Sequence, residues 1–237
     1  MEKIIAALWA PDGEPCENFG ARLVRTLPAA LHTAGASGVR INIRDRAVAP
    51  ASALVQQWQA PQQDAVVQFW LPSANAMFRQ PLDAILADAC GRFAAWLVVE
   101  STIIANPSYP AAGGERTWGW SQASFISFRT DMTRAAAIAH WHSHHTRVAI
   151  ATQSNFEYVQ NQIVAPLTDG APAYDAFVEE CFPAEAMTVP EVFFAAVGDP
   201  ARFSANLAAM TESCAGFIDF ARIDIIPTSQ FDFAAGV

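Results

Sequence analysis

The pattern of apolar positions divides the first half of the chain into six predicted elements. Residues 3–9 are nearly all apolar, which is typical of a buried strand. Between Phe19 and Leu31 apolar residues recur every four positions, which predicts a helix. Around 39–43 apolar and polar residues alternate, as in a strand with one buried face. The predicted order is a strand at 3–9, a helix at 16–34, strands near 39–43 and at 65–71, a helix at 80–91 and a strand at 93–104.

The second half repeats this order after a linker rich in Pro and Gly at 107–114. A short sequence repeat supports a duplication, because the pattern Asp-Ala-x-Val-x4-Pro at 64–72 recurs at 175–183. The predicted elements are a strand at 124–130, a helix at 132–149 capped by Asp131, strands at 155–164 and 174–182, helices near 190–197 and at 200–212, and a strand at 216–226.

These elements predict two domains, at 1–110 and 118–237, each with the order β-α-β-β-α-β of a ferredoxin-like unit. The antiparallel sheet of such a unit carries helices on one face, so its other face must be covered. Two sheets in one chain can cover each other. We therefore predict an α+β fold of two tandem ferredoxin-like halves, whose sheets pack face to face as an α/β barrel within the chain.

Composition and charge exclude several classes of partner. The chain has 237 residues and a net charge of -9, and it contains no long basic run, so a nucleic-acid partner is not expected. No stretch reaches the ~18 apolar residues of a membrane span. The N-terminus lacks the length and the basic flank of a signal peptide. We expect a cytoplasmic protein without membrane association, either a monomer or a homodimer.

Candidate chemistry is concentrated at 140–145, which holds four of the five histidines. On a regular helix Trp141, His144, His145 and Val148 share one face. Burial beside an indole lowers the pKa of an imidazole and favours its neutral form, which can accept a proton. We predict that His145 is catalytic and that Trp141 and His144 bind substrate. The competing interpretation is a structural buried histidine.

The following strand adds a phenol and two amides. Tyr158 and Gln160 project to one side of a strand and Asn161 to the other. We predict Tyr158 as a second catalytic group and Gln160 and Asn161 as substrate-binding residues. A few polar groups over an apolar floor are typical of a small-molecule site. The alternative for Tyr158 is a core residue whose hydroxyl is hydrogen-bonded.

The same segments resemble the EthD family over about residues 120–226. The motifs that carry the resemblance are Trp-x-x-x-His at 141–145, Tyr-Val-Gln-Asn at 158–161, the runs at 174–179 and 193–200, and a closing strand at 217–219. The resemblance implies a barrel of the dimeric α/β group, which includes cofactor-free monooxygenases, polyketide cyclases, lactone isomerases and haem-handling proteins. Fold alone selects none of these activities. The first half lacks Trp-x-x-x-His, so one site is expected, in the second half.

Metal binding is the competing interpretation of the histidine cluster. The spacings of His140 with His144 and of His142 with His145 can chelate zinc. However, the helix offers no carboxylate beyond Asp131. The cysteines lack CxxC spacing, and no nucleotide or flavin motif is present. We therefore expect neither a metal nor another cofactor.

These observations favour an enzyme that acts on an apolar or aromatic small molecule by histidine-assisted, cofactor-free acid/base chemistry. A lyase, isomerase or cyclase is the simplest reaction class. Two alternatives stay open. One is a cofactor-free oxidoreductase or monooxygenase, and the other is a module that binds a small ligand without turnover.

Overall fold

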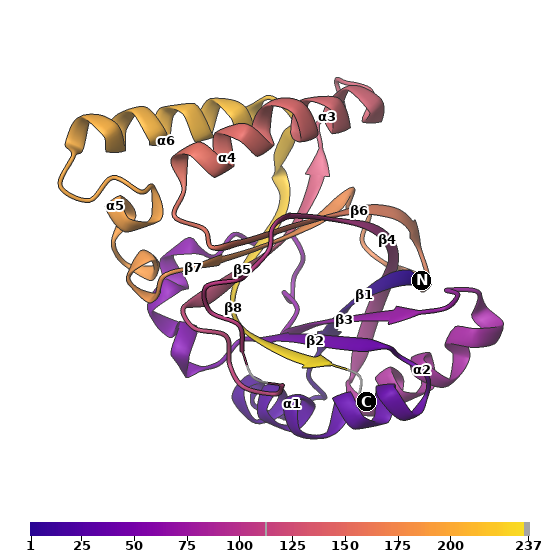
Figure 1. Ribbon diagram of the computed structural model, residues 1–237. Coiled ribbons are helices and arrows are strands. Elements are labelled where there is room, and N and C mark those ends of the chain that lie inside the picture. The colour runs from indigo at the N-terminus through magenta and orange to yellow at the C-terminus, as the bar shows by residue number, and fades with distance from the viewer. Residues whose placement is uncertain (112, 235–237) are drawn as a thin grey trace.

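A computed structural model describes residues 1–111 and 113–234, and Figure 1 shows its elements. The first half contains β1 (Glu2–Trp9), α1 (Cys16–Thr33), β2 (Gly38–Ile43), the 3-10 helix η1 (Arg46–Leu54), β3 (Ala65–Leu71), α2 (Ala76–Ala89) and β4 (Arg92–Ile104). The second half contains β5 (Trp120–Phe128), α3 (Arg134–His140), the π-helical turn η2 (Trp141–His145), α4 (Thr146–Thr152), β6 (Glu157–Pro166), β7 (Ala176–Phe182), the 3-10 helix η3 (Ala184–Met187), α5 (Pro190–Phe193), α6 (Pro200–Ala215) and β8 (Ile218–Ala234).

The order of the predicted helices and strands matches the structure, which adds η1 and η3. Most element ends differ by a few residues, and three of these differences have a clear physical reason or consequence. Thr133, not Asp131, caps α3, because the Thr133 side chain accepts from the backbone of Ala136 while Asp131 pairs with Arg129. The helix predicted near 190–197 ends at Phe193, and Ala195 has a φ of 50°, which an α-helix does not accommodate. The last strand extends beyond 226 to Ala234.

The strands form one closed antiparallel barrel in the order β1-β3-β2-β8-β5-β7-β6-β4. The strands of each half are neighbours, in the order β4-β1-β3-β2 and β8-β5-β7-β6. Backbone pairing between β2 and β8 and between β4 and β6 joins the two groups edge to edge. The extension of β8 supplies the partner of β2, which explains why this strand is so long. The mixed α+β class and the barrel are thus confirmed.

Helices cover the outside of the barrel on two sides (Figure 1). α1 and α2 lie against the first-half strands, while α3, α4 and α6 lie against the second-half strands. Under α1 and α2 the space is filled by tightly packed apolar side chains, including Phe19, Leu23 and Phe69, each with no exposed surface. The helices of the second half do not fill the corresponding space, and this difference creates the site described below.

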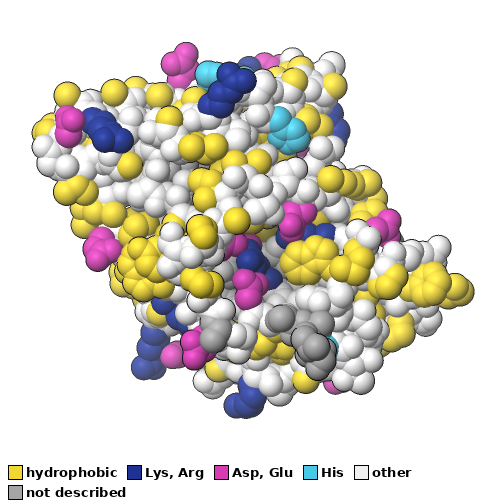
Figure 2. Space-filling model, in the orientation of Figure 1, with side chains coloured by type: hydrophobic (Ala, Val, Ile, Leu, Met, Phe, Trp, Pro, Cys, Tyr) yellow, Lys and Arg dark blue, Asp and Glu magenta, His cyan; other side chains and the backbone are white. Residues whose placement is uncertain are grey.

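The barrel interior is part apolar and part charged. Trp96 and Phe125 pack in its apolar part. In its charged part Arg40 donates to Glu157 at 2.6 Å, to Glu179 at 2.9 Å and to both oxygens of Asp232. A cavity of about 310 Å³ opens at this charged end. Figure 2 shows acidic and basic side chains meeting near the centre of the face that it presents.

The helix between β5 and β6 is continuous from Arg134 to Thr152 but contains the wider turn η2. The backbone N–H of Thr146 donates to the carbonyl of Trp141, five residues earlier, which is the π-helical pattern. Such insertions rotate the following side chains relative to a regular helix. Within the described residues no helix combines the length and the apolar character that crossing a bilayer requires.

Candidate functional site

A cavity of about 610 Å³ lies between the outer face of β5, β7 and β8 and the helices of the second half. Its size is within the range of small-molecule sites. Residues of η1 and the following Gln56 close one side, so the first half contributes to the wall. The remaining wall is made by η2, Gln153, α6, Phe217 and the segment from η3 to Phe194.

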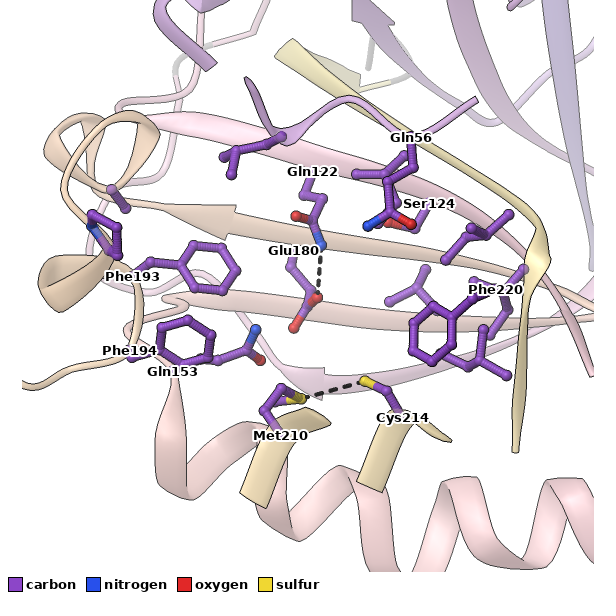
Figure 3. A pocket seen from close by; sticks show the side chains of 18 of the residues that line it. Gln56, Gln122, Ser124, Gln153, Glu180, Phe193, Phe194, Met210, Cys214 and Phe220 are labelled. Atoms are coloured by element: carbon purple, nitrogen blue, oxygen red, sulfur yellow. Dashed lines mark hydrogen bonds between the residues drawn. The ribbon is translucent and has the colours of Figure 1, made fainter. Parts of the chain in front are cut away.

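Most of the cavity wall is apolar, and several of its side chains are aromatic. Figure 3 shows Phe193 and Phe194 at one end, Phe220 at the other, and Met210 and Cys214 projecting from α6. The polar lining residues are Gln56, Gln122, Ser124, His145, Gln153, Thr188 and Glu180. Figure 3 also shows that Gln122 and Glu180 point toward one another from neighbouring strands. The cavity can therefore hold an apolar molecule against a small polar region.

Glu180 is the carboxyl group in this wall, and only 7% of the residue is exposed. Burial raises its pKa to about 7, and a hydrogen bond from Asn155 lowers it only in part. The Nδ2 of Asn155 donates to one carboxyl oxygen at 2.8 Å, and the Nε2 of Gln122 reaches the other at 3.5 Å. A carboxyl group that titrates near neutrality in a cavity can exchange a proton with a bound molecule.

His145 also lines the cavity, and 8% of it is exposed. Burial, followed by the nearby His140 and His144, lowers its pKa to about 4, so the imidazole is neutral at pH 7. Its Nδ1 lies 3.0 Å from the hydroxyl of Ser213, and its ring packs against Phe217. Ser213 thus fixes the orientation of the ring through Nδ1.

Two polar atoms in the same wall have no hydrogen-bond partner among the residues that the structure describes. They are the hydroxyl of Ser124 and the Oε1 of Gln153, and both are fully buried. Buried polar atoms are nearly always paired, and an unpaired one is costly. A ligand with hydrogen-bonding groups that reaches either atom could pair with it.

The structure brings together two of the six residues that sequence analysis assigned to the site. Trp141 and His145 line the cavity. His144 is exposed, because η2 rotates it away from the face on which a regular helix would place it. The expectation that His144 shares the buried face is therefore corrected.

Tyr158, Gln160 and Asn161 lie outside the cavity wall, so the expectation that Tyr158 shares one cavity with Trp141 and His145 is corrected. Tyr158 packs behind Trp141, and its hydroxyl accepts from Gln160 at 2.7 Å. Gln160 also donates to Thr146, and burial raises the pKa of Tyr158. Asn161 projects from β6 on the opposite face from Tyr158 and Gln160 and is completely buried. Any role of these three residues in catalysis or binding stays a prediction.

The histidine cluster does not converge on one point. The rings of His140 and His144 are 4.9 Å apart, while His140 contacts the carbonyl of Ser213 and His142 is exposed. Across the described part of the chain, no group of three His, Cys, Asp or Glu side chains is placed to hold a metal ion. Whether the protein works without a metal stays a prediction.

Sequence analysis missed Glu180, although the sequence contains a signal for it. Glu179 and Glu180 are consecutive carboxylates in a strand that is otherwise apolar. Because side chains alternate along a strand, one carboxylate must face the barrel interior and the other the helices. Glu179 has its partners inside the barrel, and Glu180 faces the cavity.

Fold and site together define an α+β barrel protein with a cavity of about 610 Å³ under the helices of its second half. The EthD domain model matches residues 129–221, which confirms the resemblance drawn from the sequence. This segment includes Trp141, His145 and Glu180. No curated protein matches the chain.

Three solved structures are similar to this chain at low sequence identity. An anthrone oxidase-like protein superimposes with a TM-score of 0.59 at 6% identity, covering 100% of this chain and 94% of that one. A protein provisionally described as a monooxygenase, from Lactobacillus acidophilus NCFM, gives a TM-score of 0.47 at 10% identity, covering 99% of this chain and 96% of that one. A dye-decolorizing protein from V. cholerae gives 0.40 at 11% identity, with 99% and 93% covered. At such identities the first of these likenesses supports the fold alone.

Proposed function

We propose that this protein is an enzyme that binds an apolar or aromatic small molecule in the cavity and acts on it by acid/base chemistry. The observation that carries the proposal is the position of Glu180, a buried carboxyl group with a pKa of about 7 in the wall of an apolar cavity. A base whose pKa lies near the working pH transfers protons efficiently. Glu180 would take a proton from the bound molecule.

In this proposal His145 orients the substrate and does not act as the main base. Its pKa of about 4 makes the neutral imidazole a weak proton acceptor at pH 7, but a neutral imidazole can donate or accept a hydrogen bond. The unpaired hydroxyl of Ser124 and the amide of Gln122 are suited to hold an oxygen on which negative charge develops. Proton transfer of this kind serves a lyase, isomerase or cyclase.

A cofactor-free oxygenation is the second candidate, because it can begin with the same proton abstraction. The fold shared with an anthrone oxidase-like protein favours testing it. The two candidates differ in one measurement, since an oxygenation consumes dioxygen with turnover and an isomerisation does not.

Two tandem ferredoxin-like halves, at 1–110 and 118–237, form part of the same proposal. The order β-α-β-β-α-β in each half supports it, as does the strand order β4-β1-β3-β2 that β8-β5-β7-β6 repeats. The first half would then serve as a structural partner, which supplies η1 and Gln56 to the cavity.

The test is a thermal-shift screen of aromatic catabolites, followed by product analysis of each compound that stabilises the protein. We expect Glu180→Gln to lower turnover by about 10²-fold or more while ligand binding persists, as loss of a general base does. His145→Ala should also reduce turnover more than binding. Unchanged turnover in Glu180→Gln would exclude the proposed base. Ligand binding without turnover of any stabilising compound would favour a binding module.

A further inference from the structure

The cavity wall is unusual in its charge as well as in its apolar character. Among the described residues that line it, none is Lys or Arg, and Glu180 is the one carboxyl group. His145 is neutral at pH 7. An anionic ligand would therefore find no opposite charge and, above about pH 7, would lie near the ionised carboxylate of Glu180. Uncompensated like charges in a poorly solvated site repel strongly.

Two acceptors in the wall, the Oε1 of Gln153 and the carboxyl of Glu180, need further donors, while the hydroxyl of Ser124 can donate or accept. The Oε1 of Gln153 is a buried acceptor without a partner. The carboxyl of Glu180 receives one short hydrogen bond, from Asn155 at 2.8 Å, and one long bond, from Gln122 at 3.5 Å. An ionised carboxylate can accept about four hydrogen bonds. A ligand that donates a hydrogen bond would satisfy Gln153 or Glu180, and a ligand that only accepts would leave both without the donor.

From these features we infer that the cavity selects uncharged aromatic molecules that carry a hydroxyl group, and that it discriminates against aromatic anions. The hydroxyl donates to Glu180 or to Gln153, and the ring packs among Phe193, Phe194, Phe217 and Phe220. An organic ammonium fits less well, because the apolar wall would remove its hydration shell. This inference rests on the cavity of the proposed function and names its substrate class.

Three probes with the same bicyclic ring test the inference: 2-naphthol, 2-naphthoate and 2-naphthylmethylamine, titrated calorimetrically into the full chain. At pH 8 we expect 2-naphthol to bind at least about tenfold more tightly than 2-naphthoate. The reason is that the ligand carboxylate and the Glu180 carboxylate repel each other at close range in a poorly solvated site, which lowers the affinity by more than about tenfold. The affinity for 2-naphthoate should rise as the pH falls from 8 to 5.5, because Glu180 gains a proton in this interval. The affinity for 2-naphthol should change little.

Glu180→Gln keeps the shape of the side chain and removes its charge. In this variant 2-naphthoate should bind at pH 8 as it does to the unmodified protein at pH 5.5, and its pH dependence should disappear. The matched control is Glu185→Gln, which removes a carboxylate beside the cavity-lining Ala186 but from an exposed position. The control should bind all three probes like the unmodified protein.

Several results would overturn the inference. They are 2-naphthoate binding as tightly as 2-naphthol at pH 8, the ammonium probe binding more tightly than 2-naphthol, and no detectable binding of 2-naphthol. The pH series uses the unmodified protein, so the test does not depend on whether Glu180→Gln folds. None of these measurements requires turnover. If the charge preference is absent but turnover depends on Glu180, the inference is excluded and the proposed function stands. If the charge preference is present but turnover does not depend on Glu180, the role of Glu180 as a base is excluded.

Discussion

Glu180 should make the protein less stable as the pH rises, and Glu180→Gln should remove this effect. The group has no cationic partner among the described residues, and burial raises its pKa from 4.5 to about 7. The folded protein therefore holds this proton more tightly than the unfolded chain does. Below about pH 4.5 both states carry the proton and the group has no effect on the free energy of unfolding. Between that pH and about 7 the folded state loses stability, and above 7 the loss is complete.

The size of this loss follows from the same two pKa values. One unit of difference corresponds to about 1.4 kcal/mol, so the change from 4.5 to about 7 amounts to about 3 kcal/mol at pH 8. Gln at this position is uncharged at every pH, and its carbonyl oxygen can still accept from the Nδ2 of Asn155. Glu180→Gln should accordingly be more stable than the unmodified protein at pH 8 by up to about 3 kcal/mol.

Urea unfolding of both proteins at intervals from pH 4.5 to pH 8 measures this difference directly. The two free energies of unfolding should converge at the acidic end and separate as the pH rises through 7. Glu185→Gln is the control for loss of a carboxylate from an exposed position, and it should show no comparable separation. A difference that does not vary with pH, or a variant less stable at pH 8, would refute the argument that Glu180 is buried without charge compensation.

Three further predictions concern neighbouring groups. Glu179→Gln should destabilise the fold by about 3–5 kcal/mol in urea unfolding, because it removes a buried partner of Arg40; a stabilised variant would contradict this assignment. Tyr158→Phe should cost about 1 kcal/mol through the lost hydrogen bond with Gln160 and leave the affinity for 2-naphthol unchanged, since Tyr158 lies outside the cavity wall; lost affinity in calorimetry would place it in the site. Purified protein should contain no stoichiometric zinc or iron by elemental analysis, and about one metal per chain, lost on mutation of His144 and His145, would reverse that expectation.

Local sequence patterns predicted most of the helices and strands, because the spacing of apolar residues within each element is sufficient to identify it. The alternation near 39–43 and the helical spacing between Phe19 and Leu31 both match observed elements. The order of elements was enough to predict a barrel. The extension of β8 to Ala234 was missed, because its apolar and polar residues make sense only against its partner β2 on the other half of the chain.

The candidate site was harder to predict because it depends on features that no local pattern contains. Trp141 and His145 were found from their spacing, but η2 changes the helix geometry and turns His144 outward. The cavity exists because α3, α4 and α6 leave a space above their strands, whereas α1 and α2 leave none above theirs. In addition, η1 and Gln56 close one side of this space. Tyr158 has a hydroxyl group that could act in catalysis, yet this hydroxyl already accepts a hydrogen bond from Gln160.

Glu179 and Glu180 show how one strand can give two identical side chains opposite properties. Burial alone would raise the pKa of both carboxyl groups. For Glu179 this effect is exceeded by Arg40 and by hydrogen bonds from Gln230, Asn42 and Gln68, so its pKa is lowered. Glu180 has one short hydrogen bond and no cation, so its pKa rises toward neutrality. The alternation of the strand places the first carboxylate where it stabilises the barrel interior and the second where a ligand can reach it. The proton-transfer role that we propose for Glu180 therefore requires no catalytic motif in the sequence, because the different surroundings of the two faces of β7 are enough to raise its pKa.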